Sequence, residues 1–242
     1  MTFSKDITTL AITKMHGGVC TAGIDSTGCW VRPVRALSQQ SSSTTGASDY
    51  SLLPIDFFHG GTSHLVNLAV TRVYLTGQAP DPPHVEDWII DSRKKPELLR
   101  KLAPSEQRDF LASHAEPGIS RLLPTLSASL CLVRPKRFSF LFRVAPSGSD
   151  VSVRSSFTAG ADRLGDIACT DLRMRALGRS MLAGKPRETE LRLGEDDFLR
   201  RGKSEVYFAL GLSRLYQGKH WPLVVGVHSI PELDVEIDYA RL

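Results

Sequence analysis

The sequence has little cysteine, and its cysteines form no pattern that would hold a metal ion or a disulfide framework. The four, Cys20, Cys29, Cys131 and Cys169, are scattered along 242 residues without a C-x-x-C pair. Zinc sites and disulfide-rich scaffolds both require closely spaced cysteines. We therefore expect free thiols, mostly buried, and no metal or other cofactor.

Long hydrophobic runs are also absent. No apolar stretch approaches the roughly 20 residues needed to cross a bilayer. The first seven residues, MTFSKDI, lack the basic segment followed by an apolar one that a signal peptide shows. Apolar residues make up 41% of the chain and charged residues 23%, which is ordinary for a folded soluble protein. We expect a folded, cytoplasmic protein that does not bind membranes.

The chain lacks the sequence motifs of the common catalytic classes. It contains no G-x-S-x-G, no H-E-x-x-H, and neither of the phosphate-binding patterns G-x-x-x-x-G-K-[ST] and G-x-G-x-x-G. Its seven histidines show no metal-ligand spacing. These absences argue against a hydrolase, a metalloenzyme, an ATPase or a dinucleotide-dependent enzyme, so we expect a protein without catalytic residues.

Short apolar stretches separated by turn residues predict a mainly β protein with short helices. A doubly wound sheet would need a helix after nearly every strand, so two small antiparallel β-barrels explain the pattern better. We place the first at 1–122, with a helical insertion near 95–114, and the second at 123–242. The predicted helices are 95–102, 104–114 and 170–178, and the predicted strands are 7–14, 19–24, 29–34, 62–75, 129–133, 138–144, 151–157, 205–213 and 223–230.

The turn tetrad Asp25-Ser-Thr-Gly28 predicts a β-hairpin near the N-terminus. With Asp25 opposite Gly28, the register places Gly23 opposite Trp30. Side chains that lie opposite one another share a face of the sheet, so Trp30 and Arg32 would lie together on one face beside small residues. That face is a candidate platform for a nucleic-acid base.

Positive charge is concentrated in one part of the chain. The net charge is +4, and residues 129–179 hold nine basic side chains against four acidic ones. A local positive field is expected of a protein that neutralises phosphates, although this excess is small for a dedicated nucleic-acid binder.

Candidate nucleic-acid contacts combine cations for phosphates with an aromatic ring on which a base can stack. A structural role is open for each of them: Trp30 can pack under a loop, and the arginines can pair with acids. Arg175 and Arg179 are four residues apart and can share one helix face. The candidates are Lys14, His16, Trp30, Arg32, Arg35, Lys136, Arg137, Thr170, Asp171, Arg173, Arg175, Arg179 and Arg214.

Several patches resemble one known family. The segment KMHGGVCTAGID at 14–25, followed by GCWVRPV at 28–34, resembles the opening of prokaryotic dual OB-containing domain proteins. The segments CTDLR at 169–173 and VYFALGLSR at 206–214, and the pair His220-Trp221, resemble later blocks of that family. The resemblance implies two OB-like barrels that recognise nucleic acid or nucleotides without a catalytic centre. It also implies a role in prokaryotic defence or conflict systems.

Three functions stay open at this point. The leading one is a non-catalytic module that binds single-stranded or structured RNA or DNA. The second is a protein-interaction subunit that docks an effector enzyme. The third is a nucleotide sensor or weak hydrolase, with its site around His16, Thr170, Asp171 and Arg173. Salt-dependent nucleic-acid binding, a co-purifying protein, and thermal stabilisation by a nucleotide distinguish them.

Overall fold

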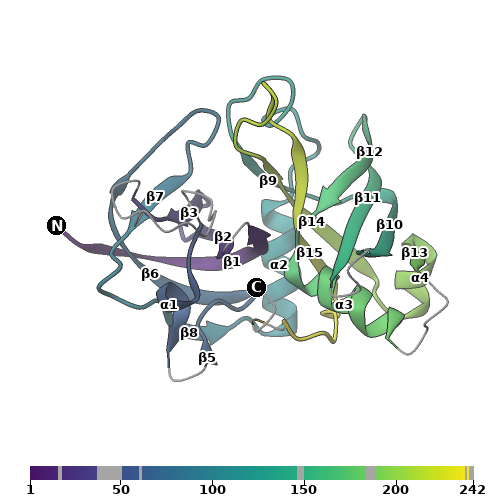
Figure 1. The fold of residues 1–242 in the computed structure, drawn as a ribbon, viewed down its shortest axis with the longest axis horizontal. Coiled ribbons are helices and arrows are strands. Elements are labelled where there is room, and N and C mark those ends of the chain that lie inside the picture. The colour runs from purple at the N-terminus through teal and green to yellow at the C-terminus, as the bar shows by residue number, and fades with distance from the viewer. Residues whose placement is uncertain are drawn as a thin grey trace. The chain divides into compact units, whose positions relative to one another are not determined.

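The computed structural model describes residues 1–15, 18–36, 51–59, 62–145, 150–183, 189–237 and 239, and the chain divides into two compact units (Figure 1). Unit 1 comprises Met1–Gln107 and Leu126–Leu130, and unit 2 comprises Arg108–Thr125 and Cys131–Arg241. The boundary predicted after residue 122 lies inside the stretch 108–125 that belongs to unit 2. Within the described ranges, no helix is long and apolar enough to span a membrane.

Unit 1 is built around a closed five-stranded barrel. Its strands follow the order β1-β2-β3-β7-β6, and an additional pairing of β1 with β6 closes the ring. Only β3 and β7 run parallel. This order, with the fifth strand between the third and the fourth, is that of an OB-type barrel. The strands are β1 (Phe3–Met15), β2 (Gly18–Asp25), β3 (Trp30–Val34), β6 (Ala69–Gln78) and β7 (Asp87–Ile90).

Alternating side chains explain how the barrel of unit 1 holds together. In β6, buried residues alternate with more accessible ones over most of the strand, as expected of a strand with one face on a core. From this strand Val73 and Leu75 pack with Ile7 of β1 and Val31 of β3. The alternation of apolar and polar residues along β6 therefore places Val73 and Leu75 in the core of the barrel.

The remaining elements of unit 1 include one correction. Residues 104–114 form the predicted helix α2 (Pro104–His114), but 97–101, predicted as helix, form strand β8 (Glu97–Lys101). Helices this short are unstable in isolation, and β8 instead pairs with the edge of β6. The other elements are α1 (Pro54–Phe57), β4 (Phe58–His59) and β5 (Thr62–Ser63).

The predicted hairpin forms, but its register is shifted by one residue. Gly23 lies opposite Val31, not opposite Trp30. The Asp25 N–H donates to the carbonyl of Cys29 at 2.9 Å, so the turn contains three residues and ends on Gly28 with φ at +81°. Such a turn is common in hairpins, and a one-residue shift moves each side chain to the other face. The prediction that Trp30 lies opposite Gly23, on the same face as the small residues of β2, is therefore wrong.

Unit 2 repeats the barrel order within a larger sheet. Its sheet has the order β13-β10-β11-β12-β15-β14-β9, and the pair β12–β15 is parallel. The inner five strands thus follow the same order as in unit 1, which confirms the predicted mainly β fold with OB-like barrels. The elements are β9 (Leu130–Val133), β10 (Lys136–Val144), β11 (Val151–Ala159), β12 (Asp162–Cys169), α3 (Leu172–Leu182), β13 (Glu190–Gly194), α4 (Glu195–Arg200), β14 (Glu205–Leu212) and β15 (Pro222–Ile230).

Phenylalanines fill the core of unit 2. Phe138 packs edge-on against Phe198 and Phe208, with ring centroids 5.2 and 5.5 Å apart. Phe157 meets Phe208 in the same way at 5.1 Å. Phe138 of β10 and Phe157 of β11 belong to buried positions that alternate with more accessible ones. The opposite face of these two strands is therefore accessible and mostly polar.

Candidate nucleic-acid interface

Two predicted contact residues of unit 1 are held by carboxylates. The Arg32 side chain is buried, and its Nε donates to the Asp87 carboxylate at 2.6 Å. Arg35 Nε lies 3.3 Å from the Asp56 carboxylate. Removing a buried charge from its partner is costly, so Arg32 is placed to stabilise the β3–β7 pair rather than to contact a ligand.

The other unit 1 candidates do not form an open platform. Lys14 and Trp30 are half-buried, and His16 lies outside the described residues. Strand β2 is buried along nearly its whole length. A Cβ placed on Gly18 would lie 2.3 Å from the Leu52 carbonyl oxygen, because the Leu52 backbone pairs with Val19 along the edge of this strand. OB folds bind oligonucleotides on the face of strands two and three, and here that face is covered.

The loop between β6 and β7 in unit 1 is proline-rich and acidic. Its residues, APDPPHVE at 79–86, include no phenylalanine, tyrosine or tryptophan. Glu86 is buried, and its carboxylate accepts hydrogen bonds from the backbone and the hydroxyl of Ser129 at 2.9 and 2.8 Å. The imidazole of this loop, His84, is buried, so the loop presents neither a ring to bases nor a cation to phosphates.

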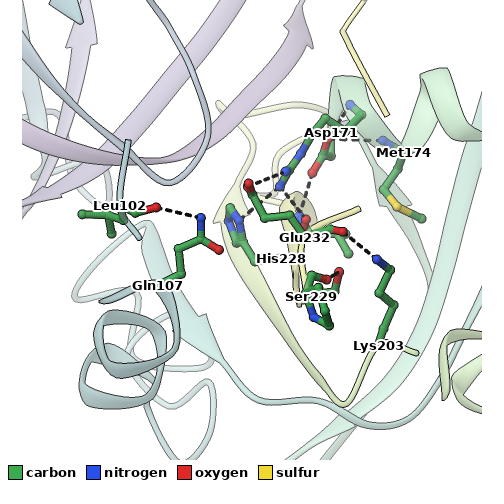
Figure 2. Close-up of polar contacts among 11 residues, drawn as sticks. Leu102, Gln107, Asp171, Met174, Lys203, His228, Ser229 and Glu232 are labelled. Atoms are coloured by element: carbon green, nitrogen blue, oxygen red, sulfur yellow. Dashed lines mark hydrogen bonds and ion pairs between the residues drawn. The ribbon is translucent and has the colours of Figure 1, made fainter. Parts of the chain in front are cut away.

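A buried polar network in unit 2 includes Asp171, His228 and Glu232 (Figure 2), and Arg173 joins them. Arg173 donates from Nη2 to the Val227 carbonyl at 2.8 Å and lies 3.2 Å from His228 Nδ1, and its Nη1 lies 3.4 Å from Glu232. Asp171 caps α3 and also accepts from the Val227 N–H at 2.6 Å. Burial raises the pKa of Asp171. Both side chains are thus engaged within the protein, joining α3 to β15.

The other candidates at α3 are also partnered. Arg175 and Arg179 share one face of the helix, as their spacing predicted, and both pair with Asp150. The Thr170 N–H donates to the Val224 carbonyl at 2.9 Å. The helix N-terminus already has Asp171 as its anion, so the geometry here is that of a capped helix packed on a barrel.

Several outward-facing cations of unit 2 lie on β10, β11 and β12. Lys136 lies opposite Thr158, and Thr158 lies opposite Arg163, so these three residues form one row across the strands. Arg154 lies on β11 with 37% of its side chain exposed. We call Lys136, Arg154 and Arg163 the basic face. Arg137, next to Lys136, is exposed, and its backbone N–H donates to Glu195.

The loop between β14 and β15, residues 213–221, which we call the aromatic loop, holds exposed residues that the sequence did not identify as candidate contacts. Leu215, Tyr216 and Trp221 are 67, 62 and 44% exposed. The predicted candidate Arg214 belongs to the same loop, as do Lys219 and His220. The dipeptide Gln217-Gly218 between aromatic residues was the sequence signal, because such pairs favour tight hairpin turns.

Hydrogen bonds hold the aromatic loop in one conformation. The Tyr216 N–H donates to the Lys219 carbonyl at 2.9 Å, and the two central residues have φ of +53° and +74°, as in a type I′ turn. Ser213 N–H donates to the Trp221 carbonyl at 2.8 Å. The indole Nε1 of Trp221 donates to the Tyr216 carbonyl at 3.1 Å. The two rings are therefore presented to solvent without needing to be ordered on binding.

The aromatic loop and the basic face lie at the same end of unit 2. Strand β15 follows the loop and pairs in parallel with β12, with Ala168 opposite Leu223. Because the pair is parallel, the chain before Leu223 and the part of β12 before Ala168 both enter it from the same end of unit 2. Figure 1 shows the loop and the β11–β12 hairpin at the same end of unit 2. Unit 2 thus has exposed rings and outward-facing cations at the same end.

No group of three or more His, Cys, Asp or Glu side chains that could hold a metal ion occurs in the part of the chain that the structure describes. None of the four cysteines forms a disulfide, and Cys131 and Cys169 are buried. Burial raises the pKa of the Cys169 thiol, which keeps it protonated and inert.

The family model described as a dual OB-containing domain matches residues 5–227. No curated protein matches the chain.

Proposed function

Because this chain belongs to the dual OB-containing domain family, we propose that it is a non-catalytic module that binds nucleic acid through unit 2. OB folds bind oligonucleotides on the face of strands two and three and with the loops that join strands one to two and four to five. In unit 2, strands two and three are β11 and β12, and the loop that joins strands four and five is the aromatic loop. The prokaryotic, defence-related setting and the cytoplasmic location implied earlier are parts of the same proposal.

The observation that carries the proposal is the exposure of Tyr216 and Trp221 at the end of unit 2 that also bears the basic face. Stacking on a protein ring contributes about 1–3 kcal/mol per base. Such stacking requires unpaired bases, so we favour single strands and the unpaired loops of structured RNA or DNA. In this proposal bases stack on Tyr216 and Trp221, while Lys136, Arg154 and Arg163 contact phosphates and make the affinity salt-dependent.

Fluorescence anisotropy with labelled single-stranded DNA and RNA, at low ionic strength, tests the proposal. We expect Trp221→Ala and Tyr216→Ala each to weaken binding by roughly 5-fold to 100-fold, the equivalent of one lost stacking contact. Leu199→Ala is the matched control, because Leu199 is 53% exposed on α4 and lies outside the aromatic loop. Failure of the wild-type protein to bind either nucleic acid, or an unchanged affinity in both variants, would contradict the proposal.

A protein-docking role is the second candidate, and exposed Leu215 favours it. An aliphatic side chain that is 67% exposed beside two rings also suits the centre of a protein interface. If unit 2 docks an effector enzyme, Leu215→Ser will release a co-purified protein while the affinity for nucleic acid stays unchanged.

A further inference from the structure

Strand β12 contains a bulge on the face that we assign to nucleic acid. The pairing of β11 with β12 passes from Ser155 opposite Ile167 to Phe157 opposite Leu164. One residue of β11 therefore opposes two of β12, Gly165 and Asp166. Asp166 has φ at +53°, a left-handed conformation that few residues other than glycine adopt, with Asp and Asn among the more tolerant.

Side chains of β11 hold this bulge. Arg154 Nε donates to the Asp166 carboxylate at 2.8 Å, and Arg154 also donates to the Asp166 carbonyl. The Asp166 N–H donates to Ser156 Oγ at 3.1 Å. The Asp166 side chain is 80% exposed, so the carboxylate lies on the solvent side of the guanidinium. Arg154 lowers the pKa of Asp166, which keeps the carboxylate ionised.

The bulge and the aromatic loop lie on the same side of the β12–β15 pair along the strands. Ala168 lies opposite Leu223 in the parallel pair of β12 and β15. Asp166 precedes Ala168 by two residues, and Trp221 precedes Leu223 by two. Because the strands are parallel, both residues lie before the paired residues in the same direction along the strands. A strand whose base stacks on Trp221 would therefore bring its phosphates to the Arg154–Asp166 pair.

Carboxylates and phosphates compete for the same guanidinium donors. Arginine presents a planar set of N–H groups that fits either anion. The pair is largely exposed, and exposed ion pairs are weak, so a phosphate can displace the carboxylate. While Asp166 keeps its charge, each phosphate that approaches Arg154 also meets a negative group.

We propose that Asp166 competes with the phosphate backbone of bound nucleic acid for Arg154 and so limits the affinity of unit 2. This inference rests on the proposed function, because it assigns a competing group at the same site. It makes Asp166 a positioning residue that sets both how tightly the face binds and how strongly salt weakens the complex.

Asp166→Asn tests the inference with little change of shape, because asparagine also tolerates the left-handed backbone. We expect its dissociation constant for single-stranded DNA at low salt to fall about 3-fold to 10-fold, and the slope of log affinity against log salt to steepen by about 0.7, the value of one further phosphate contact. Asp196→Asn is the matched control, since it removes one negative charge from an exposed residue of α4. It should bind within about twofold of the wild-type protein.

Two further variants keep the test decisive. Asp166→Gly also suits the positive φ and must tighten binding in the same direction, even if the Asn variant folds poorly. Arg154→Met must remove the gain when combined with Asp166→Asn. If wild-type protein binds and both Asp166 variants match Asp196→Asn, the inference is overturned and the proposed function stands. If wild-type protein does not bind, the proposed function falls as well.

Discussion

Arg173 carries its charge inside unit 2, where its guanidinium meets the Val227 carbonyl, His228 and Glu232. Arg173 lies near a helix start and in the most basic part of the chain. This sequence context fits a phosphate contact as well as a structural role inside the protein. Burial decides between the two roles, because a buried guanidinium cannot reach a ligand without breaking its own hydrogen bonds. The same reasoning applies to Arg32 and its partner Asp87 in unit 1.

At the scale of the residue, Arg173→Met is expected to destabilise the protein. It leaves a buried carbonyl and a carboxylate without their donor, so the free energy of unfolding should fall by about 2–4 kcal/mol. Urea denaturation measures this change. Arg200→Met, at an exposed position, should change it little. A variant that unfolds like the wild-type protein but has lost nucleic-acid binding would instead make Arg173 a contact residue.

At the scale of the element, α3 lies unusually close to its sheet. A Cβ on Gly178 would lie 2.5 Å from Phe142 Cδ1 and 2.9 Å from Val151 Cγ1, both in the core of unit 2. Glycine is unfavourable inside a helix, and here its small size permits the close packing that carries the polar network onto β15.

The helix–sheet contact therefore predicts that Gly178→Ala destabilises the protein. Helix propensity alone would make alanine stabilising by about 1 kcal/mol. The clash with buried side chains should outweigh that gain and lower the free energy of unfolding by about 1–3 kcal/mol. Gly77→Ala is the control in a urea titration, because nothing lies within 4 Å of its added Cβ. Equal or higher stability of Gly178→Ala would contradict the packing described.

The corresponding loops of the two barrels differ in chemistry. Both join the fourth strand to the fifth, β6 to β7 in unit 1 and β14 to β15 in unit 2. The first is acidic and rich in proline, and its Glu86 holds Ser129. The second presents Tyr216 and Trp221 to solvent. The same topology thus supports a structural loop in one unit and a candidate binding loop in the other.

At the scale of the whole molecule, we expect nucleic acid to contact unit 2 and not unit 1. A single-stranded oligonucleotide containing 5-bromouracil should crosslink, on irradiation, to peptides from 151–169 and 213–221. Salt of about 1 M should abolish the crosslinks, because it screens the phosphate contacts. Crosslinks concentrated in 1–107 would contradict the assignment to unit 2 and would favour a binding site in unit 1, at the first hairpin.

The sequence by itself determined the mainly β fold, most strand positions and helix α2. These follow from local patterns, namely the alternation of apolar residues, turn residues and helix-start signals, which act between neighbours in the chain. It also located the first hairpin, but not its register, because Asp25-Ser-Thr-Gly28 suits both a two-residue and a three-residue turn.

Only the tertiary structure decided which charges face solvent. The acids that partner Arg32 and Arg173 lie 55 and 59 residues further along the chain. The row of Lys136, Thr158 and Arg163 exists only because three strands align in one register. Ion pairing and strand alignment depend on distances in space, which a linear pattern does not contain. The candidate cations could therefore be listed from the sequence, but only the fold shows which of them face solvent.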